Sequence, residues 1–125
     1  MRLSSTLLAM FVVLTISAGA QPTVIKFEPA NGATNVDPSL TELKVTFSES
    51  MMDGSWSWMM ENKGTFPQTA GQPHYASDGK TNVLPVKLKP GKKYVLWVNS
   101  KHGHNFKSRS GVPATPARWT FQTKK

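Results

Sequence analysis

The sequence predicts an all-β protein built as a sandwich of two packed sheets. Three observations support this fold class. No stretch after residue 20 has a sustained helical pattern. Short segments of alternating apolar and polar residues recur between turn-forming Gly, Pro, Asn and Asp residues, which is typical of sandwiches and barrels. The 105 residues after residue 20 are also enough for one domain of ordinary size.

The first twenty residues have the three parts of a secretory signal peptide. Arg2 gives a positive start, residues 7–16 form an apolar stretch, and residues 18–20 (Ala-Gly-Ala) carry the small side chains that signal peptidase reads. Ten apolar residues would rise only about 15 Å as a helix, about half the membrane core, so no membrane span is expected. We therefore expect a secreted or periplasmic protein cleaved after Ala20, with residues 21–125 as a single domain.

Composition narrows the possible functions. Loss of Arg2 with the signal peptide leaves 14 basic and 7 acidic residues, a formal charge of +7 that favours anionic partners. The basic residues are scattered rather than gathered in one stripe, so nucleic acid is not expected as a partner. The chain has no cysteine, which excludes disulfides, thiolate metal sites and thiol catalysis. Stability must therefore come from burial of a core.

The first half of the chain gives four of the expected strands. Residues 23–27 form the first strand, with Ile25 and Phe27 facing one side. After turns at residues 29–32 and 37–39, residues 42–47 alternate as a half-buried strand should. Residues 55–60 form the next strand, and its inward face is expected to carry Trp56, Trp58 and Met60. A polar connection over residues 61–73 leads to a short edge strand at residues 74–76.

The second half gives the remaining three strands. Residues 81–88 form a strand that contains Pro85, which cannot donate a hydrogen bond and so favours a sheet edge or a bulge. Residues 93–99 are apolar on both faces, as expected for a central strand. Residues 117–123 close the domain, with Trp119 facing inward.

Seven strands in this length fit an immunoglobulin-like Greek-key β-sandwich. Residues 88–94 (LKPGKKY) refine the prediction because a turn places Tyr94 at the start of the penultimate strand. There its hydroxyl can reach the backbone before the turn, an arrangement called a tyrosine corner.

At these positions the chain resembles the bacterial Ig-like domains found in surface-layer and other exported proteins. The resemblance rests on Pro29-x-Asn31-Gly32, on Val36 and Leu43, on Phe47-Ser48-x-x-Met51, and on the closing Trp119-Thr120-Phe121-x-Thr123. It covers nearly all of residues 23–123 and implies spacer, adhesive or accessory roles. Its motifs are structural, so it brings no catalytic residues. We expect a non-catalytic, monomeric binding or structural module with a protein or cell-envelope glycan as partner.

A second resemblance points to copper. The small periplasmic copper-resistance β-sandwich proteins are similar in length and share the Pro-x-x-Gly turn and a strand that ends in Phe-Ser. That resemblance implies a copper site with histidine and methionine ligands. The family's usual histidine at the mature N-terminus is replaced here by Gln21, so its Cu(II) site does not transfer.

Methionine and histidine pairs in this chain are the candidate metal ligands. Thioethers suit Cu(I), and two imidazoles two residues apart can chelate Cu(II), Ni(II) or Zn(II). Met59 and Met60 are a second methionine pair, and His74 could complete a set. The alternative is that the methionines fill the core and the histidines are plain surface residues. The alternative function is therefore a periplasmic copper-binding protein that uses Met51, Met52, His102 and His104.

The loop at residues 101–116 is the candidate ligand-binding surface, because sandwiches usually recognise partners through such loops. It offers Lys101, Phe106, Lys107 and Arg109. The alternative is a solvated connection with Phe106 packed at the core edge. Trp97, on a strand that is apolar on both sides, could extend a groove for an anionic glycan. No nucleophile elbow, HExxH or P-loop motif occurs, so no enzymatic activity and no cofactor other than the alternative copper are expected.

Overall fold

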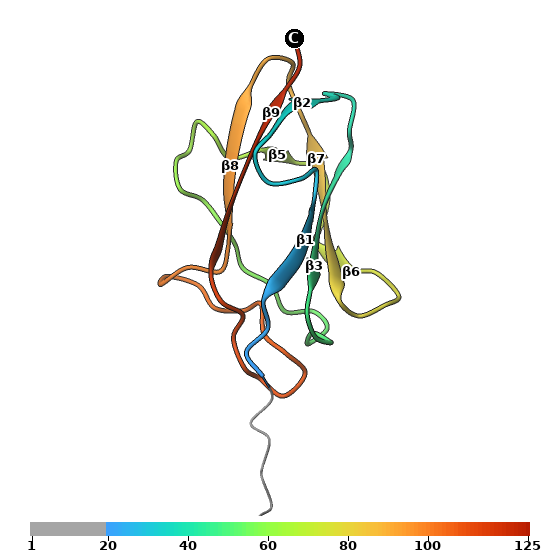
Figure 1. Ribbon diagram of the computed structural model, residues 1–125, viewed down its shortest axis with the longest axis vertical. Helices are drawn as coiled ribbons and strands as arrows, with labels where there is room; N and C mark the ends of the chain where they lie inside the picture. Colours follow the sequence, from blue (N-terminus) through green and yellow to red (C-terminus); the bar gives the residue numbers. More distant parts are fainter. Residues whose placement is uncertain (1–19) are drawn as a thin grey trace, which may run out of the picture.

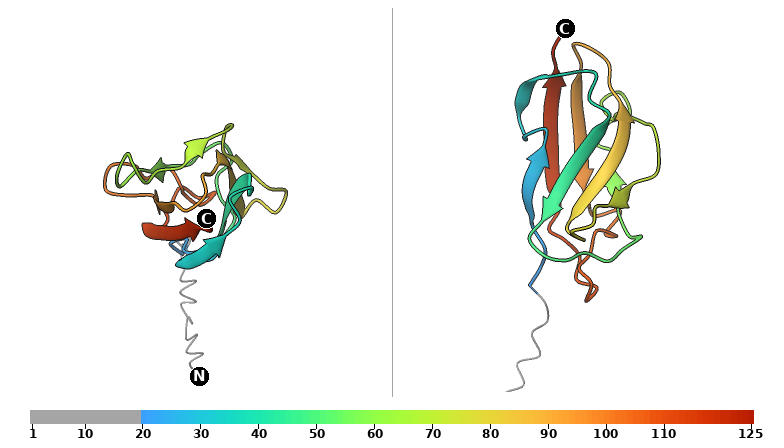
Figure 2. Two further views of the ribbon diagram at one scale, coloured as in Figure 1. Left: turned by 90° about the horizontal axis from the view of Figure 1, so that it is seen from above. Right: turned by 90° about the vertical axis from the view of Figure 1, so that its right-hand side faces the viewer.

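A computed structural model describes residues 20–125, which fold as a sandwich of two β-sheets (Figures 1 and 2). The predicted signal peptide, apart from Ala20, lies outside the described residues. The first sheet contains β1 (Val24–Glu28), β3 (Glu42–Phe47), β7 (Thr81–Lys87), β5 (Gln68–Thr69) and β6 (His74–Tyr75). The second contains β2 (Ala33–Val36), β9 (Ala117–Thr123), β8 (Lys93–Val98) and β4 (Trp58–Met59). The predicted fold class is confirmed.

The described range has two strands more than the seven predicted, β2 and β5. β2 runs parallel to β9, whereas the other strand pairs are antiparallel. The Pro-x-Asn-Gly motif sets up this pairing. The side-chain amide of Asn31 donates to the backbone oxygen of Arg118 over 3.2 Å and accepts from the backbone nitrogen of Thr120 over 2.9 Å. Gly32 follows with a φ of 84°, a conformation that favours glycine.

The prediction for the first strand was wrong at Ile25. The register between β1 and β3 shifts between Val24 and Lys26, which is a β-bulge. The extra residue turns Ile25 outward, where it is 64% exposed, and leaves Val24 and Phe27 packed against the core. Simple alternation cannot anticipate this because a bulge changes which residues share a face.

Pro85 lies inside the first sheet rather than at its edge. β7 pairs with β3 on one side and with both β5 and β6 on the other. β6 pairs with β7 at Asn82 and Val83, and β5 pairs with it at Val86 and Lys87. Pro85 lies between these two short partners, so its missing N–H interrupts neither ladder.

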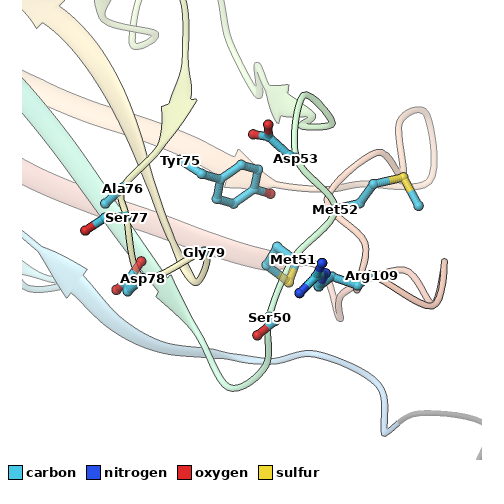
Figure 3. A pocket seen from close by; sticks show the side chains of 10 residues that line it. All are labelled: Ser50, Met51, Met52, Asp53, Tyr75, Ala76, Ser77, Asp78, Gly79 and Arg109. Atoms are coloured by element: carbon cyan, nitrogen blue, oxygen red, sulfur yellow. The ribbon is translucent and has the colours of Figure 1, made fainter.

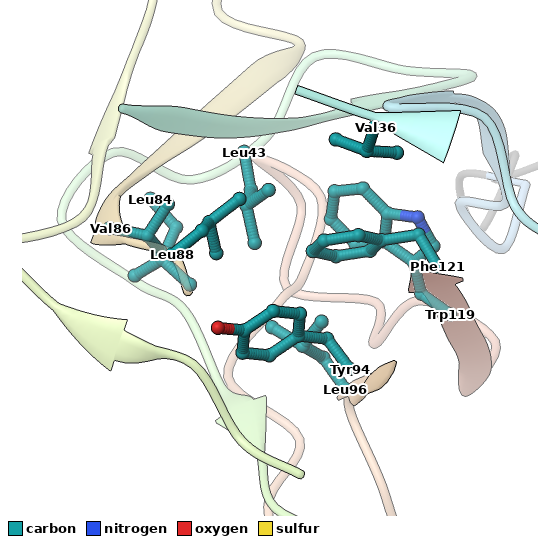
Figure 4. Packing of buried hydrophobic residues seen from close by; sticks show 9 residues of the cluster. All are labelled: Val36, Leu43, Leu84, Val86, Leu88, Tyr94, Leu96, Trp119 and Phe121. Atoms are coloured by element: carbon teal, nitrogen blue, oxygen red, sulfur yellow. The ribbon is translucent and has the colours of Figure 1, made fainter. Parts of the chain in front are cut away.

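Side chains from both sheets fill the space between them (Figure 4). Trp119 is fully buried at the centre, with its ring 5.0 Å from that of Phe27 and 6.1 Å from that of Trp58. The larger cluster consists of Val36, Leu43, Leu84, Val86, Leu88, Tyr94, Leu96, Trp119 and Phe121. A second cluster contains Val45, Phe47, Met51, Val98, Phe106 and Ala114, with Trp56 and Trp58 packed against it.

The inward position predicted for Met60 was also wrong. Its side chain is 53% exposed, because β4 ends at Met59 and the alternation expected over residues 55–60 stops there.

The predicted tyrosine corner is present. The hydroxyl of Tyr94 accepts a hydrogen bond from the backbone nitrogen of Lys89 over 2.8 Å, and the ring is buried. Its ring centroid lies 5.3 Å from that of Phe121, so the corner ties the turn between β7 and β8 to the core.

The two ends of the described chain lie at opposite ends of the long axis (Figure 1). The loop between β8 and β9 lies at the same end as residue 20, where the backbone nitrogen of Thr115 donates to the oxygen of Pro22 over 3.0 Å. In the range from residue 20 onward, no helix is long and apolar enough to cross a membrane.

Candidate functional site

The loop between β8 and β9 is held by one buried side chain, that of Asn99. Its amide nitrogen donates to the backbone oxygens of Phe106 and Ala114 over 2.8 and 3.0 Å, and its oxygen accepts from the nitrogen of Phe106 over 3.0 Å. Asn99 has a φ of 56°, a left-handed conformation that asparagine tolerates better than most residues. The loop is therefore a fixed surface whose backbone is anchored to the core.

Phe106 is fully buried, so its side chain is not available to a ligand at the loop surface. Its ring lies 5.2 Å from the rings of both Phe47 and Trp58. Of the other proposed ligand-binding residues, Lys101 and Arg109 are exposed and Lys107 is half-buried. Lys101 and Arg109 line different hollows, described next.

The first hollow lies between the segment after β3, the turn between β6 and β7, and Arg109 (Figure 3). Its volume is about 520 Å³. Backbone hydrogen bonds hold its walls together: Met51 N to Gly79 O over 2.9 Å, Met52 N to Lys107 O over 2.9 Å, and Arg109 N to Ser50 O over 3.1 Å. Three segments far apart in sequence thus form one polar pocket.

The charged groups of this pocket differ in how many hydrogen bonds other groups of the protein make to them. Backbone N–H groups and the Thr81 hydroxyl bind the Asp78 carboxylate and hold its pKa below the ordinary value. Burial, with the negative charge of Asp53 nearby, raises the pKa of Tyr75, so its hydroxyl stays protonated and donates to the oxygen of Ser55. Asp53 and the Arg109 guanidinium remain exposed at the rim.

The second hollow lies on the outer face of the second sheet. Met59, Trp97 and Arg118 are directly opposite one another on β4, β8 and β9. Leu96 and Val98 are buried beside Trp97, so this row faces away from the core. The row combines a thioether, an indole and a guanidinium on one surface.

Glu61, in the connection after β4, contacts two residues of this row, Trp97 and Arg118. Its carboxylate accepts two hydrogen bonds from the Arg118 guanidinium, each 2.8 Å, and one from the Trp97 indole N–H over 3.1 Å. These bonds, from Arg118 first and Trp97 second, lower the pKa of Glu61 to about 2. Glu61 therefore stays ionised and fixes the edge of the Trp97 ring.

This second hollow has a volume of about 460 Å³ and is lined mainly by apolar side chains. His102 enters it from a tight turn in which Ser100 and Gly103 exchange backbone hydrogen bonds of 2.9 and 3.2 Å. The turn lies directly on Met59: a Cβ built on Gly103 would be 2.7 Å from the Met59 sulfur. The residues that line the second hollow are Met59, Met60, Glu61, Trp97, Ser100, Lys101, His102 and Pro116.

The structure divides the predicted copper ligands between the two hollows. Met51 is buried and Met52 half-buried in the first hollow, while His102 lines the second beside Met59 and Met60. His104 is exposed and lines neither. Between residues 20 and 125, no three His, Asp or Glu side chains gather as a metal site.

Sequence reasoning missed the contribution of Glu61, Arg118 and Asn99 to these surfaces. Glu61 and Arg118 are 57 positions apart, and only the sheet register brings them together. Asn99 carried one available signal, since an asparagine directly after a strand often adopts a left-handed conformation.

Comparisons with known proteins agree with the fold. A family profile described as a bacterial Ig-like domain matches residues 18–123. The structure of surface layer protein SbsC, domains 1–6, is similar with a TM-score of 0.54 and 19% identity, over 87% of this chain. The structure of the S-layer protein rSbsC(31-844) is similar with a TM-score of 0.51 and 18% identity, over 84% of this chain.

Both similarities concern the fold alone, and this chain covers 14% of each surface-layer chain. No curated protein matches it significantly. Because the family match spans nearly all of the described sandwich, the chain belongs to the family of bacterial Ig-like domains.

Proposed function

We propose that this protein is an exported, non-catalytic Ig-like module that acts as a structural or binding domain at the cell surface or in the periplasm. The observation that carries the proposal is the family match over residues 18–123. The position of the two ends supports it. The loop between β8 and β9 lies at one end of the long axis and the turn between β7 and β8 at the other, so the two ends of the sandwich can contact different partners (Figure 1).

The bonding of the loop hydroxyls supports a non-catalytic role. A serine nucleophile needs an adjacent base. Here the hydroxyls of Ser108 and Ser110 bond to each other over 2.9 Å, and Ser55 donates to the backbone oxygen of Asn105. Among residues 20–125, the histidine side-chain hydrogen bond that the structure records joins the His74 ring to the backbone oxygen of Gln72.

Export is tested by expressing the full chain with a C-terminal tag in a bacterial host and fractionating the cells. We expect the tagged protein in the envelope or medium, with Gln21 as its first residue by mass spectrometry. A double substitution, Ala18→Arg with Ala20→Arg, should block cleavage because it removes the small residues at both recognition positions. Intact protein that begins at Met1 and stays in the cytoplasm would contradict the proposal.

Arg109, exposed at the rim of the first hollow, points to a glycan carboxylate bound at that rim, because Asp53 and Asp78 make the inside of the pocket net negative. The exposed guanidinium can bind a sugar carboxylate through two parallel hydrogen bonds. The Asp53 carboxylate can accept hydrogen bonds from sugar hydroxyls (Figure 3). The volume of about 520 Å³ suits a sugar unit. The net charge of +7 would also draw a polyanion to the domain.

This ligand is tested with polygalacturonate as the acidic probe and dextran as the neutral one. We expect binding to polygalacturonate alone, weakened by Arg109→Gln but not by Lys63→Gln, which removes the same charge from an exposed site elsewhere. Equal loss in both variants would show that only net charge matters and would reject the pocket as the glycan site.

A further inference from the structure

The hollow beside Trp97 gathers three soft donor groups from separate parts of the chain. Met59 lies on β4, Met60 follows it, and His102 lies in the tight turn after β8. We propose that Met59, Met60 and His102 form a binding site for a soft monovalent metal ion of the Cu(I) class. Thioether and imidazole are the donors that such ions prefer.

The contact between Met59 and Gly103 fixes the Met59 sulfur relative to the turn that carries His102. Gly103 packs so closely on the Met59 sulfur that a Cβ would come within 2.7 Å of it. The His102 backbone nitrogen donates to the Ser100 hydroxyl over 3.1 Å, which holds the residue before Gly103 in its turn. Met59 and His102 therefore line the same hollow, one from β4 and the other from the turn that packs on it.

Two hydrogen bonds dock this turn onto the second sheet. The Ser57 hydroxyl accepts from the backbone nitrogen of Asn105 over 2.9 Å, and the backbone nitrogen of Asn99 donates to the Ser57 oxygen over 3.0 Å. The position of His102 is thus set by Ser57, which directly precedes the strand that carries Met59, and this lowers the conformational cost of binding an ion.

Met60 supplies the third donor. Its side chain is 53% exposed, and it is one of two large hydrophobic residues that remain exposed in the described part of the chain. Met60 lines the same hollow as Met59, so its flexible, exposed side chain can bring a thioether to an ion bound there. Burial in the core, the usual role of methionine, therefore does not explain this residue.

The charged groups of the hollow disfavour hard cations. Both oxygens of the Glu61 carboxylate are bonded to Arg118, so it is not a free ligand for Ca²⁺ or Mg²⁺. Lys101 adds a positive charge at the same wall. An ion held here must bind through polarisable donors rather than through charge, which selects Cu(I) over Mg²⁺, Ca²⁺ and Zn²⁺.

The test uses purified protein without residues 1–20 and two probes. Ag(I) serves as a redox-inert probe, and Cu(I) is added under reductant with a competing chelator. We expect saturation at one equivalent, with quenching of tryptophan emission because Trp97 lines the site. Zn²⁺ should neither bind tightly nor displace Ag(I).

Substitutions assign the donors. Met59→Leu, Met60→Leu and His102→Asn should each weaken Ag(I) binding by about tenfold or more, while unfolding curves stay close to those of the parent protein. Met52→Leu and His104→Asn are the matched controls and should leave the affinity unchanged. Gly103→Ala should weaken binding without removing a donor, because the new methyl displaces the Met59 sulfur.

Two results would overturn the site. One is the lack of saturable binding at one equivalent. The other is a loss of affinity in Met52→Leu or His104→Asn as large as in the Met59 and His102 variants. As a readout independent of affinity, Ag(I) should shift the methyl NMR signals of Met59 and Met60 and not those of Met51 and Met52.

Discussion

The side-chain amide of Asn99 pairs with the backbone of Phe106 through two hydrogen bonds, one of 2.8 Å to its oxygen and one of 3.0 Å from its nitrogen. A single buried side chain thus makes the backbone hydrogen bonds that a neighbouring strand would make in a sheet. The same amide also binds the oxygen of Ala114, so the middle of the loop and its final segment depend on one residue. The two hollows share this anchored loop as a wall.

Asn99→Gly should destabilise the protein by about 3 kcal/mol, because it leaves three backbone groups near the core without their partner. Asn99→Ala should cost about 1 kcal/mol more, since alanine also resists the φ of 56°. Denaturant unfolding of both variants checks the values. Unchanged stability of Asn99→Gly would contradict the anchoring role.

Tyr94→Phe should destabilise the sandwich by about 1 kcal/mol, because the Lys89 N–H loses its acceptor while the ring remains packed. For a domain of this size the melting temperature should fall by about 4–8 °C. Tyr75→Phe is the matched control. It removes the hydroxyl that donates to the Ser55 oxygen, on a ring that is only half-buried, and it should destabilise the protein less.

Glu61 should make stability depend on pH in the acid range. Its pKa is lowered from 4.5 to about 2 in the folded protein, so its contribution is fully present above about pH 4.5 and is lost as the pH falls through about 2. Glu61→Gln should therefore be less stable than the parent at neutral pH, and the difference should disappear only below about pH 2. NMR titration of the Glu61 carboxyl gives an independent value, and a pKa near 4.5 would contradict the bidentate contact with Arg118. Because the pair is exposed, added salt should weaken the effect.

Gly111→Ala should lower the free energy of unfolding by about 1 kcal/mol, because alanine resists the left-handed backbone conformation at this position. Gly111 has a φ of 87°, and a Cβ there would meet nothing within 4 Å. Gly111→Asn should cost less, since asparagine tolerates left-handed conformations. Thermal unfolding of the two variants separates this backbone effect from a steric one. Equal losses would indicate that a side chain of any kind clashes at this turn.

Local patterns were sufficient to predict most of the strands of this fold. Trp119 and Phe121 alternate with polar residues on a long strand, and Tyr94 follows a Pro-Gly turn, so each could be assigned from neighbours in sequence. β2 could not be assigned in this way. It is four residues long, only half of its residues are apolar, and it exists because Asn31 and Gly32 align it with the last strand of the chain.

The candidate sites were less predictable because they depend on packing between distant segments. The residue types of the metal prediction were reasonable, but nothing in the sequence indicates that His102 shares a hollow with Met59 rather than with Met51. That choice follows from the contact of Gly103 with the Met59 sulfur, which exists only in the folded chain. Phe106 shows the same effect, since an apolar residue in a polar loop can face the solvent or the core.

The bulge in β1 also affects how copies of this protein behave when they are crowded together. An exposed, regular edge strand invites another chain to add to the sheet and begin a polymer. Here β1 is irregular at Val24–Lys26, β2 has an irregular register, and β4, β5 and β6 have two residues each. Each sheet margin therefore offers too short or too uneven a row of N–H and C=O groups for a second copy to extend. Such a domain can be packed densely at a surface and remain a separate folded unit.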